Sequence, residues 1–326
     1  MKKMYLYHAV SMYQILEVIL HKNKYHKNDK CILILPDFIV NKFPEYKKIE
    51  QLGIFDEVVL FPYLYIEHNR ETLIYNLEQA YQKTMLYDIY DFSEIYIAGV
   101  HFYFSVYLIE KEIHFFCFED AARMVFQPRR LYENIAYRFK THAEIAREKG
   151  LIDLSSPFIT GVYVNKKSKE IHKKQIVFNV TKELFFGRTI RNKLLILFAA
   201  KEVICPLGTK IVLTEQFYVM GKMSKEEQKE IYKQIIEKEI KEKDSYIIVK
   251  PHPDDEIDYR YISDRVVQID RVCPAELLPY LLKGKPSEII SISSSSVNNL
   301  KKFYKISIEN RGLTYENSSC YTNETK

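Results

Sequence analysis

Apolar residues along the chain form short continuous runs that alternate with longer stretches of helical spacing. In the first 120 residues, runs such as CILILPD (31–37) and EIYIAGV (94–100) are typical of strands buried on both faces of a sheet. The intervening stretches 12–25 and 70–88 place apolar residues three or four positions apart, which predicts amphipathic helices. This alternation of strand and helix predicts a doubly wound, mostly parallel sheet.

The second half of the chain repeats this architecture without repeating the sequence. A mixed, Lys- and Arg-rich segment spans about 125–205, and a helix is expected over 133–150, ending at Gly150. Strand-like runs resume at TKIVLTEQ (209–216) and recur at 245–252, 266–270, 287–293 and 305–309. Between them, helices are expected over 224–243, 274–283 and 294–303. We therefore expect an α/β protein of two Rossmann-like domains, residues 1–180 and 181–326. Its ligand site should lie at the carboxyl ends of the strands, in a cleft between the domains.

Composition narrows the class of protein. A chain of 326 residues is longer than one core usually needs, and 47% hydrophobic with 28% charged residues suits a soluble globular protein. The net charge of +5 is compatible with an anionic ligand or an anionic membrane surface, while the lack of a dense basic tract argues against nucleic acid. No signal peptide or membrane-spanning run is recognisable, so we expect a cytoplasmic protein, at most peripheral to the inner membrane. Four of the five scattered cysteines lie in or beside apolar runs, so buried thiols in a reducing compartment are expected.

Three polar clusters follow predicted strands. They are FED (118–120), KPHPDD (250–255) and SISSSS (291–296). Because the carboxyl ends of parallel strands meet at one edge of each sheet, we expect all three at the rim of the cleft. Gln216, at the end of the strand-like run 209–216, occupies a further rim position.

His252 lies between two prolines, which restrict the backbone around the imidazole. A ring held in this way can donate a hydrogen bond to a phosphate or a proton to a leaving group. The alternative is a loop histidine bonded to the backbone. Lys250 and Pro253 belong to the same stretch and are further candidates for nucleotide binding.

The HPDDE stretch (252–256) also resembles the zinc-binding motif of the LmbE-like N-acetyl sugar deacetylases. That site needs a further histidine downstream, and no histidine follows His252 in this chain. A zinc site would then require an unusual third ligand, so no metal is expected.

Each of the other polar residues has two possible roles, one structural and one functional. Ser294, Ser295 and Ser296 either cap a helix or offer hydroxyls and N–H groups to a phosphate. Glu276, at the start of a predicted helix, either complements the helix dipole or binds the two hydroxyls of a ribose. Glu119 and Asp120 are either a helix cap or, in one of the two, a general base.

Taken in order, EDA (119–121), HP (252–253) and SSSS (293–296) resemble the acidic, HP and serine motifs of bacterial sialyltransferases, in particular glycosyltransferase family 52. The family has glycine where this chain has Ala121, which bears on the fit of the acceptor. The resemblance implies a GT-B fold and inverting, metal-independent transfer of sialic acid from CMP-sialic acid to a hydroxyl of a lipooligosaccharide or capsular glycan. It allows a homodimer by analogy.

The family pattern also implies a role for each candidate. Glu119, or Asp120 beside it, would deprotonate the acceptor, and His252 would stabilise or protonate the departing CMP phosphate. The serines would hold that phosphate, and Glu276 would hold the ribose. Two alternatives stay open: a CDP-glycerol or CDP-ribitol phosphotransferase, since the HP motif also occurs in teichoic-acid polymerases, and a non-catalytic glycan-binding protein of the same fold.

Overall fold

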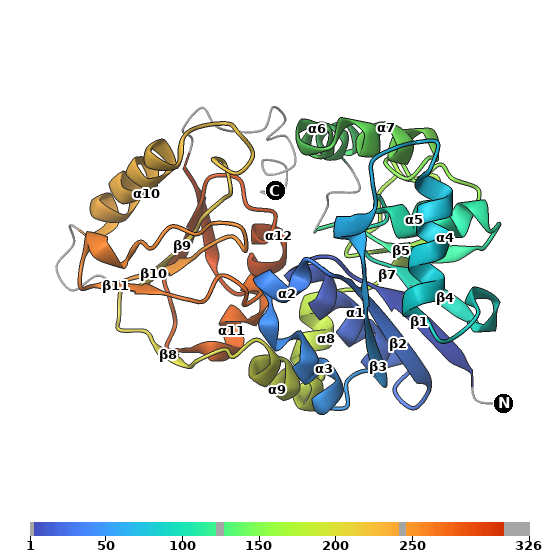
Figure 1. The fold of residues 1–326 in the computed structure, drawn as a ribbon. Helices are drawn as coiled ribbons and strands as arrows, with labels where there is room; N and C mark the ends of the chain where they lie inside the picture. Colours follow the sequence, from blue (N-terminus) through green and yellow to red (C-terminus); the bar gives the residue numbers. More distant parts are fainter. Residues whose placement is uncertain (1–2, 122–126, 241–245, 310–326) are drawn as a thin grey trace. The chain divides into compact units, whose positions relative to one another are not determined.

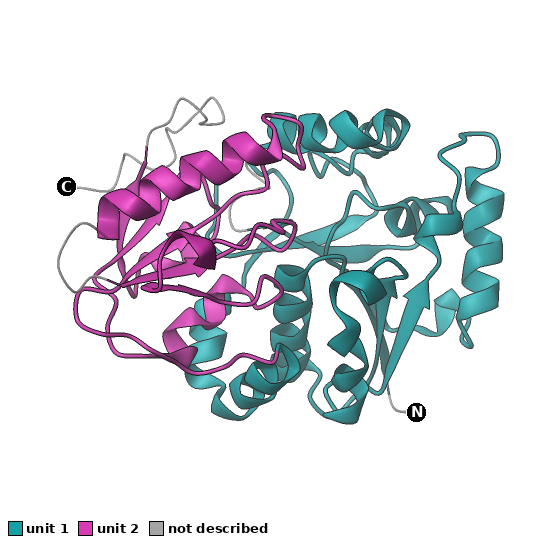
Figure 2. Ribbon diagram, turned by 60° about the vertical axis from the view of Figure 1, so that its left-hand side comes forward, with its two compact units in different colours: residues 1–198 teal, residues 199–326 magenta. Residues whose placement is uncertain are grey.

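The computed structural model describes residues 3–121, 127–240 and 246–309. The chain divides into two compact units, unit 1 (residues 1–198) and unit 2 (residues 199–326), which Figure 2 colours separately. The division falls after Phe198 and not after residue 180, because helices α8 (Val180–Phe186) and α9 (Arg188–Leu197) pack against helix α1 (Met12–Tyr25) of unit 1.

Unit 1 is built on a seven-stranded sheet in which every neighbouring pair is parallel, in the order β3-β2-β1-β4-β5-β6-β7 (Figure 1). Five strands of this sheet are predicted by apolar runs, and all five are present; the runs are 3–9, 31–37, 56–62, 94–100 and 113–120. Strands β6 and β7 lie in the segment expected to be mixed. The strands are β1 (Met4–His8), β2 (Lys30–Pro36), β3 (Glu57–Phe61), β4 (Glu94–Ile97), β5 (Phe115–Phe118), β6 (Ile159–Val164) and β7 (Gln175–Val177).

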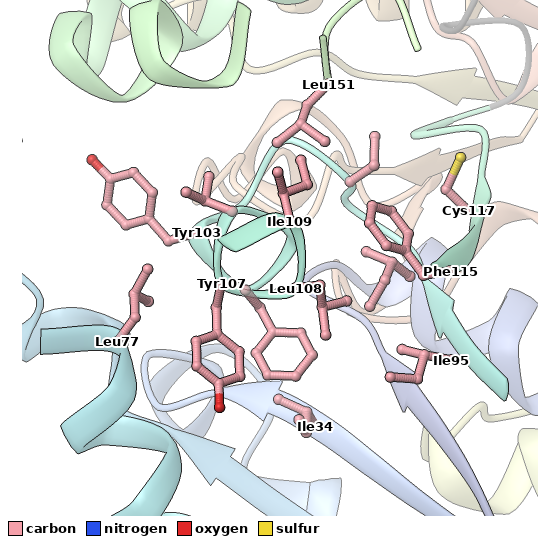
Figure 3. Packing of buried hydrophobic residues seen from close by; sticks show 14 of the residues in the cluster. Ile34, Leu77, Ile95, Tyr103, Tyr107, Leu108, Ile109, Phe115, Cys117 and Leu151 are labelled. Atoms are coloured by element: carbon pink, nitrogen blue, oxygen red, sulfur yellow. The ribbon is translucent and has the colours of Figure 1, made fainter. Parts of the chain in front are cut away.

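Helices cover both faces of this sheet, because alternate residues of a strand point to opposite sides. Leu6 of β1 belongs to a core shared with α4 (Leu73–Thr84), α5 (Tyr103–Glu110) and α7 (Lys140–Glu148). Figure 3 shows α5 at the centre of that core, with Leu108 and Ile109 among its buried side chains. The next residue, Tyr7, points to the other face, where its ring meets His21 of α1. The unit is therefore doubly wound, as the alternation predicts.

The helix expected over 133–150 is instead two helices, α6 (Pro128–Arg138) and α7, which is a correction to the sequence-based expectation. The chain leaves helical geometry at Phe139, where φ is −141° and ψ is 76°. Gly150 follows α7 with φ +66°, the left-handed conformation that commonly ends a helix, as expected.

Unit 2 contains a second, five-stranded sheet, also parallel throughout, in the order β11-β10-β9-β13-β14. Helix α10 (Lys225–Ile240) buries Tyr232, Ile235 and Ile236 in the core of one face. The strands are β9 (Lys210–Leu213), β10 (Ile247–Lys250), β11 (Val266–Gln268), β13 (Glu288–Ser291) and β14 (Lys305–Ile308). A separate two-stranded ladder joins β8 (Val203–Ile204) to β12 (Leu282–Lys283).

Two helices of unit 2 are shorter than the sequence suggests. The helix expected over 274–283 is a 3-10 turn (Ala275–Leu277) followed by α11 (Leu278–Leu281), because the next two residues pair in β12. The helix expected after the serine run is only α12 (Val297–Leu300), where Asn298 turns its side chain back to the Ser295 carbonyl.

The described cysteines agree with the expectation of buried thiols. Four cysteines are free and buried, while Cys320 lies outside the described part of the chain. These four are Cys31, Cys117, Cys205 and Cys273. In the described ranges no helix has both the length and the apolar character to cross a bilayer.

Candidate functional site

The carboxyl edge of the unit 1 sheet gathers polar residues from three neighbouring strands. Strands β1, β4 and β5 are adjacent and parallel, so the segments that follow them meet at one edge. Gln14 comes from the start of α1, His101 from the β4–α5 connection and Asp120 from the end of β5. Hydrogen bonds join Gln14 to Asp120 across 106 residues of sequence.

Glu119 forms hydrogen bonds that connect strand β5 to the end of β6. Its N–H donates to the Tyr163 carbonyl at 3.0 Å, and its Oε1 accepts the N–H of Asn165 at 2.9 Å. The residue is 1% exposed. These contacts fasten the end of β6 to β5, and a role for Glu119 as the general base stays a prediction.

Asp120 has the more accessible carboxylate of the two acids, with 23% of its side chain exposed. Gln14 Nε2 donates to Asp120 Oδ1 at 2.8 Å and to its carbonyl at 3.3 Å. Burial raises the pKa of Asp120 to about 6, against the opposing effect of the Gln14 hydrogen bond. A carboxylate that is mostly ionised at neutral pH, yet more basic than usual, suits a general base.

Three buried histidines surround this edge, and the sequence analysis missed all of them. His101 Nδ1 lies 3.8 Å from Asp120 Oδ1, and His142 Nε2 contacts the His101 carbonyl at 2.7 Å. His8 contacts the Ala98 carbonyl at 2.9 Å and the Tyr63 hydroxyl at 2.8 Å. Burial lowers their pKa values to about 4 for His8 and His101 and about 3 for His142, so all three are neutral at pH 7. His8 ends one predicted strand and His101 follows another, so the strand-end rule applied to 118–120 could have found both.

In unit 2, the loop after β10 holds His252 through its own backbone. The His252 N–H donates to Thr214 Oγ1 at 3.2 Å, and the Asp254 N–H donates to His252 Nδ1 at 3.1 Å. Because Nδ1 accepts a hydrogen bond, the neutral ring carries its proton on Nε2. The imidazole is half-buried, and its Nδ1 is committed to the loop.

Asp255 anchors the same loop and was not predicted as a site residue. It is 1% exposed and accepts from the Ile257 N–H at 3.1 Å, the Tyr259 hydroxyl at 3.0 Å and the Thr214 hydroxyl. Burial raises its pKa, and the hydrogen bonds oppose that shift. Since Thr214 also accepts from His252, Asp255 acts on the histidine through one intervening hydroxyl.

Lys250 and Glu276 form a second buried polar group beneath this edge. Lys250 is 4% exposed, and its Nζ donates to the Arg271 carbonyl at 3.0 Å and to the Pro251 carbonyl. Burial lowers the pKa of Lys250 to about 8. Glu276 is 2% exposed, accepts from Asn299 Nδ2 at 2.9 Å, and has its pKa raised by burial. Glu276 thereby fastens the 3-10 turn to α12, next to the serine run.

The remaining candidates lie around these groups. Ser294, Ser295 and Ser296 are half-buried, and the Ser294 N–H donates to Ser291 Oγ at 3.0 Å. Two buried oxygens, Ser293 Oγ and Gln216 Oε1, have no hydrogen-bond partner in the described part of the chain. With only four residues in α12, the hydroxyls and loop amides, not a helix dipole, are the groups that a phosphate could use.

The two units bring together different subsets of the candidates. Unit 1 joins Asp120 to Gln14 and His101, while unit 2 joins His252 to Lys250 through the loop, with Pro253 half-buried beside it. The convergence of the acids with His252 stays a prediction. In the described residues no group of three or more His, Cys, Asp or Glu side chains is placed to hold a metal ion.

Comparison with known proteins identifies the fold. No protein-family model matches the sequence. An uncharacterized protein from Haemophilus influenzae is 24% identical over 282 residues, 82% of each chain. Among solved structures, a UDP-N-acetylglucosamine 2-epimerase from Rickettsia bellii aligns with 12% identity and a TM-score of 0.55 over 95% of this chain and 80% of the other.

Two further solved structures are similar. S. aureus MnaA in a co-structure with UDP gives 9% identity and a TM-score of 0.56, over 94% of this chain and 78% of the other. Arabidopsis thaliana UGT89C1 complexed with UDP-L-rhamnose gives 9% identity and a TM-score of 0.51, over 94% and 79%. At these identities the likeness shows the fold alone: the chain has the GT-B fold of these nucleotide-sugar enzymes.

Proposed function

We propose that the protein is a metal-independent glycosyltransferase that moves sialic acid from CMP-sialic acid to a hydroxyl of a bacterial surface glycan. The GT-B fold supports a nucleotide-sugar enzyme in general. The choice of CMP-sialic acid rests on the three motifs at 119–121, 252–253 and 293–296.

The observation that carries the proposal is the hydrogen bond at Nδ1 of the His252 ring. Its Nδ1 is occupied by the Asp254 N–H, which leaves the proton of the neutral ring on Nε2. In the proposed reaction this N–H donates to the phosphate of the departing CMP while the anomeric C–O bond breaks and its electron pair passes to the phosphate. Such a donor stabilises charge that develops in the transition state.

The other unit 2 residues would bind the same nucleotide. Ser294, Ser295 and Ser296 would offer hydroxyls to the phosphate, with Gln216 and Pro253 at its sides and Glu276 at the ribose. Lys250, buried behind the loop, would add a positive charge. A single phosphate needs less neutralisation than a diphosphate, so these groups can act without a metal ion.

A donor screen with the purified full-length protein tests the proposal. CMP-sialic acid, UDP-N-acetylglucosamine and CDP-glycerol are incubated in EDTA, and the release of free nucleotide is measured. We expect CMP release from CMP-sialic acid, and a loss of about 100-fold or more in His252→Ala. The matched control is His172→Ala, at an exposed histidine of unit 1, which should keep wild-type activity. Release from none of the three donors would overturn the proposal.

One observation favours a second candidate donor class. Two of the structural neighbours are complexes with UDP or with a UDP-sugar. Turnover of UDP-N-acetylglucosamine alone in the same screen would assign a UDP-sugar enzyme, and turnover of CDP-glycerol alone would assign a phosphotransferase.

The resemblance further suggests a cytoplasmic homodimer in peripheral contact with the inner membrane. Cell fractionation and sedimentation equilibrium test this part separately, because neither result depends on the donor.

A further inference from the structure

We infer that Asp120 and His101 form a proton-sharing pair in unit 1, positioned by Gln14, and that this pair deprotonates the acceptor hydroxyl. The inference rests on the proposed function for its substrate, a glycan hydroxyl. The pairing itself is a property of the unliganded protein and can be measured without any substrate.

The first observation is an unsatisfied imidazole nitrogen. His101 is 8% exposed, and its Nδ1 is buried without a hydrogen-bond partner in the described residues. Buried polar atoms nearly always have a partner, so a lone one requires an explanation. The polar side-chain atom it approaches is Asp120 Oδ1 at 3.8 Å, and a small ring movement would close this distance to a hydrogen bond.

The second observation is the way in which Asp120 is held. Gln14 Nε2 donates to Asp120 Oδ1, while Gln14 Oε1 accepts the Val10 N–H at 2.9 Å. The amide is therefore fixed at both ends, so it cannot flip without losing one bond. Gly99, with φ +75°, lies against it: a Cβ at this position would come within 3.2 Å of Gln14 Oε1. The fold thus reserves space for an amide whose role is to orient one carboxylate.

The groups around the pair leave Asp120 ionised, and so able to accept a proton, at neutral pH. His142 and His8 are the other titratable groups facing His101, with His68 next to His142, and burial keeps His8 and His142 neutral. A neutral His101 does not cancel the charge of Asp120, whose pKa is about 6. If the ring moves into hydrogen-bond contact with Asp120, we expect the two groups to titrate together.

In the proposed step, the acceptor O–H bond breaks and its proton passes to Asp120, with His101 Nδ1 able to accept a share of it. The electron pair of that bond forms the new C–O bond at the anomeric carbon of the donor. The bond from that carbon to the CMP phosphate breaks, and its electrons leave with the phosphate. Charge and atoms balance without a further reactant.

A histidine titration tests the pairing directly. The full-length protein is labelled with 15N-histidine, and the His101 ring nitrogens are followed from pH 7.5 to 4.5 in wild type, Asp120→Asn and the control His142→Gln. Gln at 142 can keep the bond to the His101 carbonyl. We expect Asp120→Asn to move the His101 resonances and titration, and His142→Gln to move them much less. An unchanged His101 signal in folded Asp120→Asn would overturn the pairing, whatever the donor is.

Kinetics then separate the pair from the donor site. His101→Asn can keep a hydrogen bond at the Nδ1 position but cannot titrate. We expect about 10-fold to 100-fold lower transfer to an acceptor and an acid limb of kcat/KM shifted to lower pH, with the affinity for CMP, measured by calorimetry, unchanged. Unchanged transfer, or a loss of transfer with an unmoved pH profile, would contradict the inference. If no donor is turned over while Asp120 and His101 still titrate together, only the proposed function fails.

Discussion

The two parallel sheets end in polar edges of different kinds. In unit 2 the group at the edge, His252, sits on a loop whose N–H groups, hydroxyls and Asp255 carboxylate are bonded to one another. In unit 1 the edge holds Asp120, with a raised pKa, and His101, with a buried nitrogen that lacks a partner. The first arrangement fixes a direction, which suits hydrogen-bond donation to a leaving group. The second leaves room for a proton, which suits a base.

The largest expected difference between the units is their response to acid. Folded unit 1 keeps His8, His21, His101 and His142 neutral through burial, with pKa values well below the 6.5 of an unfolded histidine. As the pH falls from about 6.5 toward 4, the unfolded chain binds these protons and the folded unit does not. Each histidine then removes up to about 1.4 kcal/mol of unfolding free energy per pH unit.

Asp120 works in the opposite direction, since its raised pKa lets the folded unit bind a proton first. For the four histidines and Asp120 together, the expected loss in unit 1 is about 4 kcal/mol per pH unit. His26 and His68, whose pKa values burial also lowers, add to this loss. Burial also raises the pKa values of Asp255 and Glu276. The unfolding free energy of unit 2 should therefore stay constant or rise as the pH falls. Urea unfolding at pH 7, 6 and 5, followed by hydrogen exchange on peptides from each unit, measures both. Parallel loss in the two units would contradict the comparison, and His142→Gln should reduce the unit 1 slope by about one histidine.

The next largest effect tests whether the unit 2 edge is fixed by Asp255. Asp255→Ala leaves the Thr214 hydroxyl, the Tyr259 hydroxyl and the Ile257 N–H without their acceptor, which should cost about 3 kcal/mol of unfolding free energy. The matched control is Asp258→Ala, at a carboxylate 55% exposed and paired with Arg260 on the surface, which should change stability little. Equal effects of the two changes in denaturant titrations would show that the loop is not held by this carboxylate.

The same contrast explains what sequence reasoning could and could not find. In unit 2 the candidate residues lie in one contiguous stretch after a strongly apolar strand, so Lys250 and His252 could be predicted from their neighbours in sequence. In unit 1, Gln14, His101 and Asp120 come from three segments, and what makes His101 unusual is burial, which no local pattern reveals. The accessible acid is Asp120, whereas the family pattern favoured Glu119, because backbone contacts to β6 occupy Glu119.

The strands could likewise be predicted only where the local sequence carries a strong apolar signal. Continuous apolar runs predicted β1 to β5 of unit 1 and all five strands of the unit 2 sheet. Strand β6, ITGVYV, interrupts its apolar run with Gly161, and β7 has only three residues, so neither had a strong signal. The placement of α8 and α9 in unit 1 depends on packing against α1, which the sequence does not encode locally.

Replacing one glycine in each unit by alanine should change the unfolding free energy by a smaller amount, and the two changes can be compared. Gly99 in unit 1 and Gly208 in unit 2 both have positive φ, +75° and +82°. Ala at 208 meets nothing within 4 Å, so only backbone strain of about 1 kcal/mol is expected. At Gly99 the added Cβ lies 2.6 Å from Val10 Cγ2 and would displace the Gln14 amide, so about 2 kcal/mol is expected.

The two alanine variants are compared by thermal unfolding and by the transfer assay. Gly99→Ala should also reduce transfer, because Gln14 no longer orients Asp120, while Gly208→Ala should leave transfer unchanged. Equal destabilisation in the two variants, with transfer intact in both, would remove the case for a reserved space beside Gln14.

The smallest expected change in stability is at Glu276, and it decides whether unit 2 uses one residue for both structure and ligand. Glu276→Gln keeps a carbonyl oxygen for Asn299 and removes a charge that burial already disfavours, so the unfolding free energy should shift by less than about 1 kcal/mol. If Glu276 also binds the ribose, calorimetry should show CMP affinity falling about 10-fold, because a carboxylate accepts two ribose hydroxyls and an amide accepts fewer. If CMP affinity is unchanged in a folded Glu276→Gln variant, then Glu276 has only a structural role, which is to hold α12 through Asn299. The rigid edge of unit 2 would then owe its ligand contacts to the loop amides and serines.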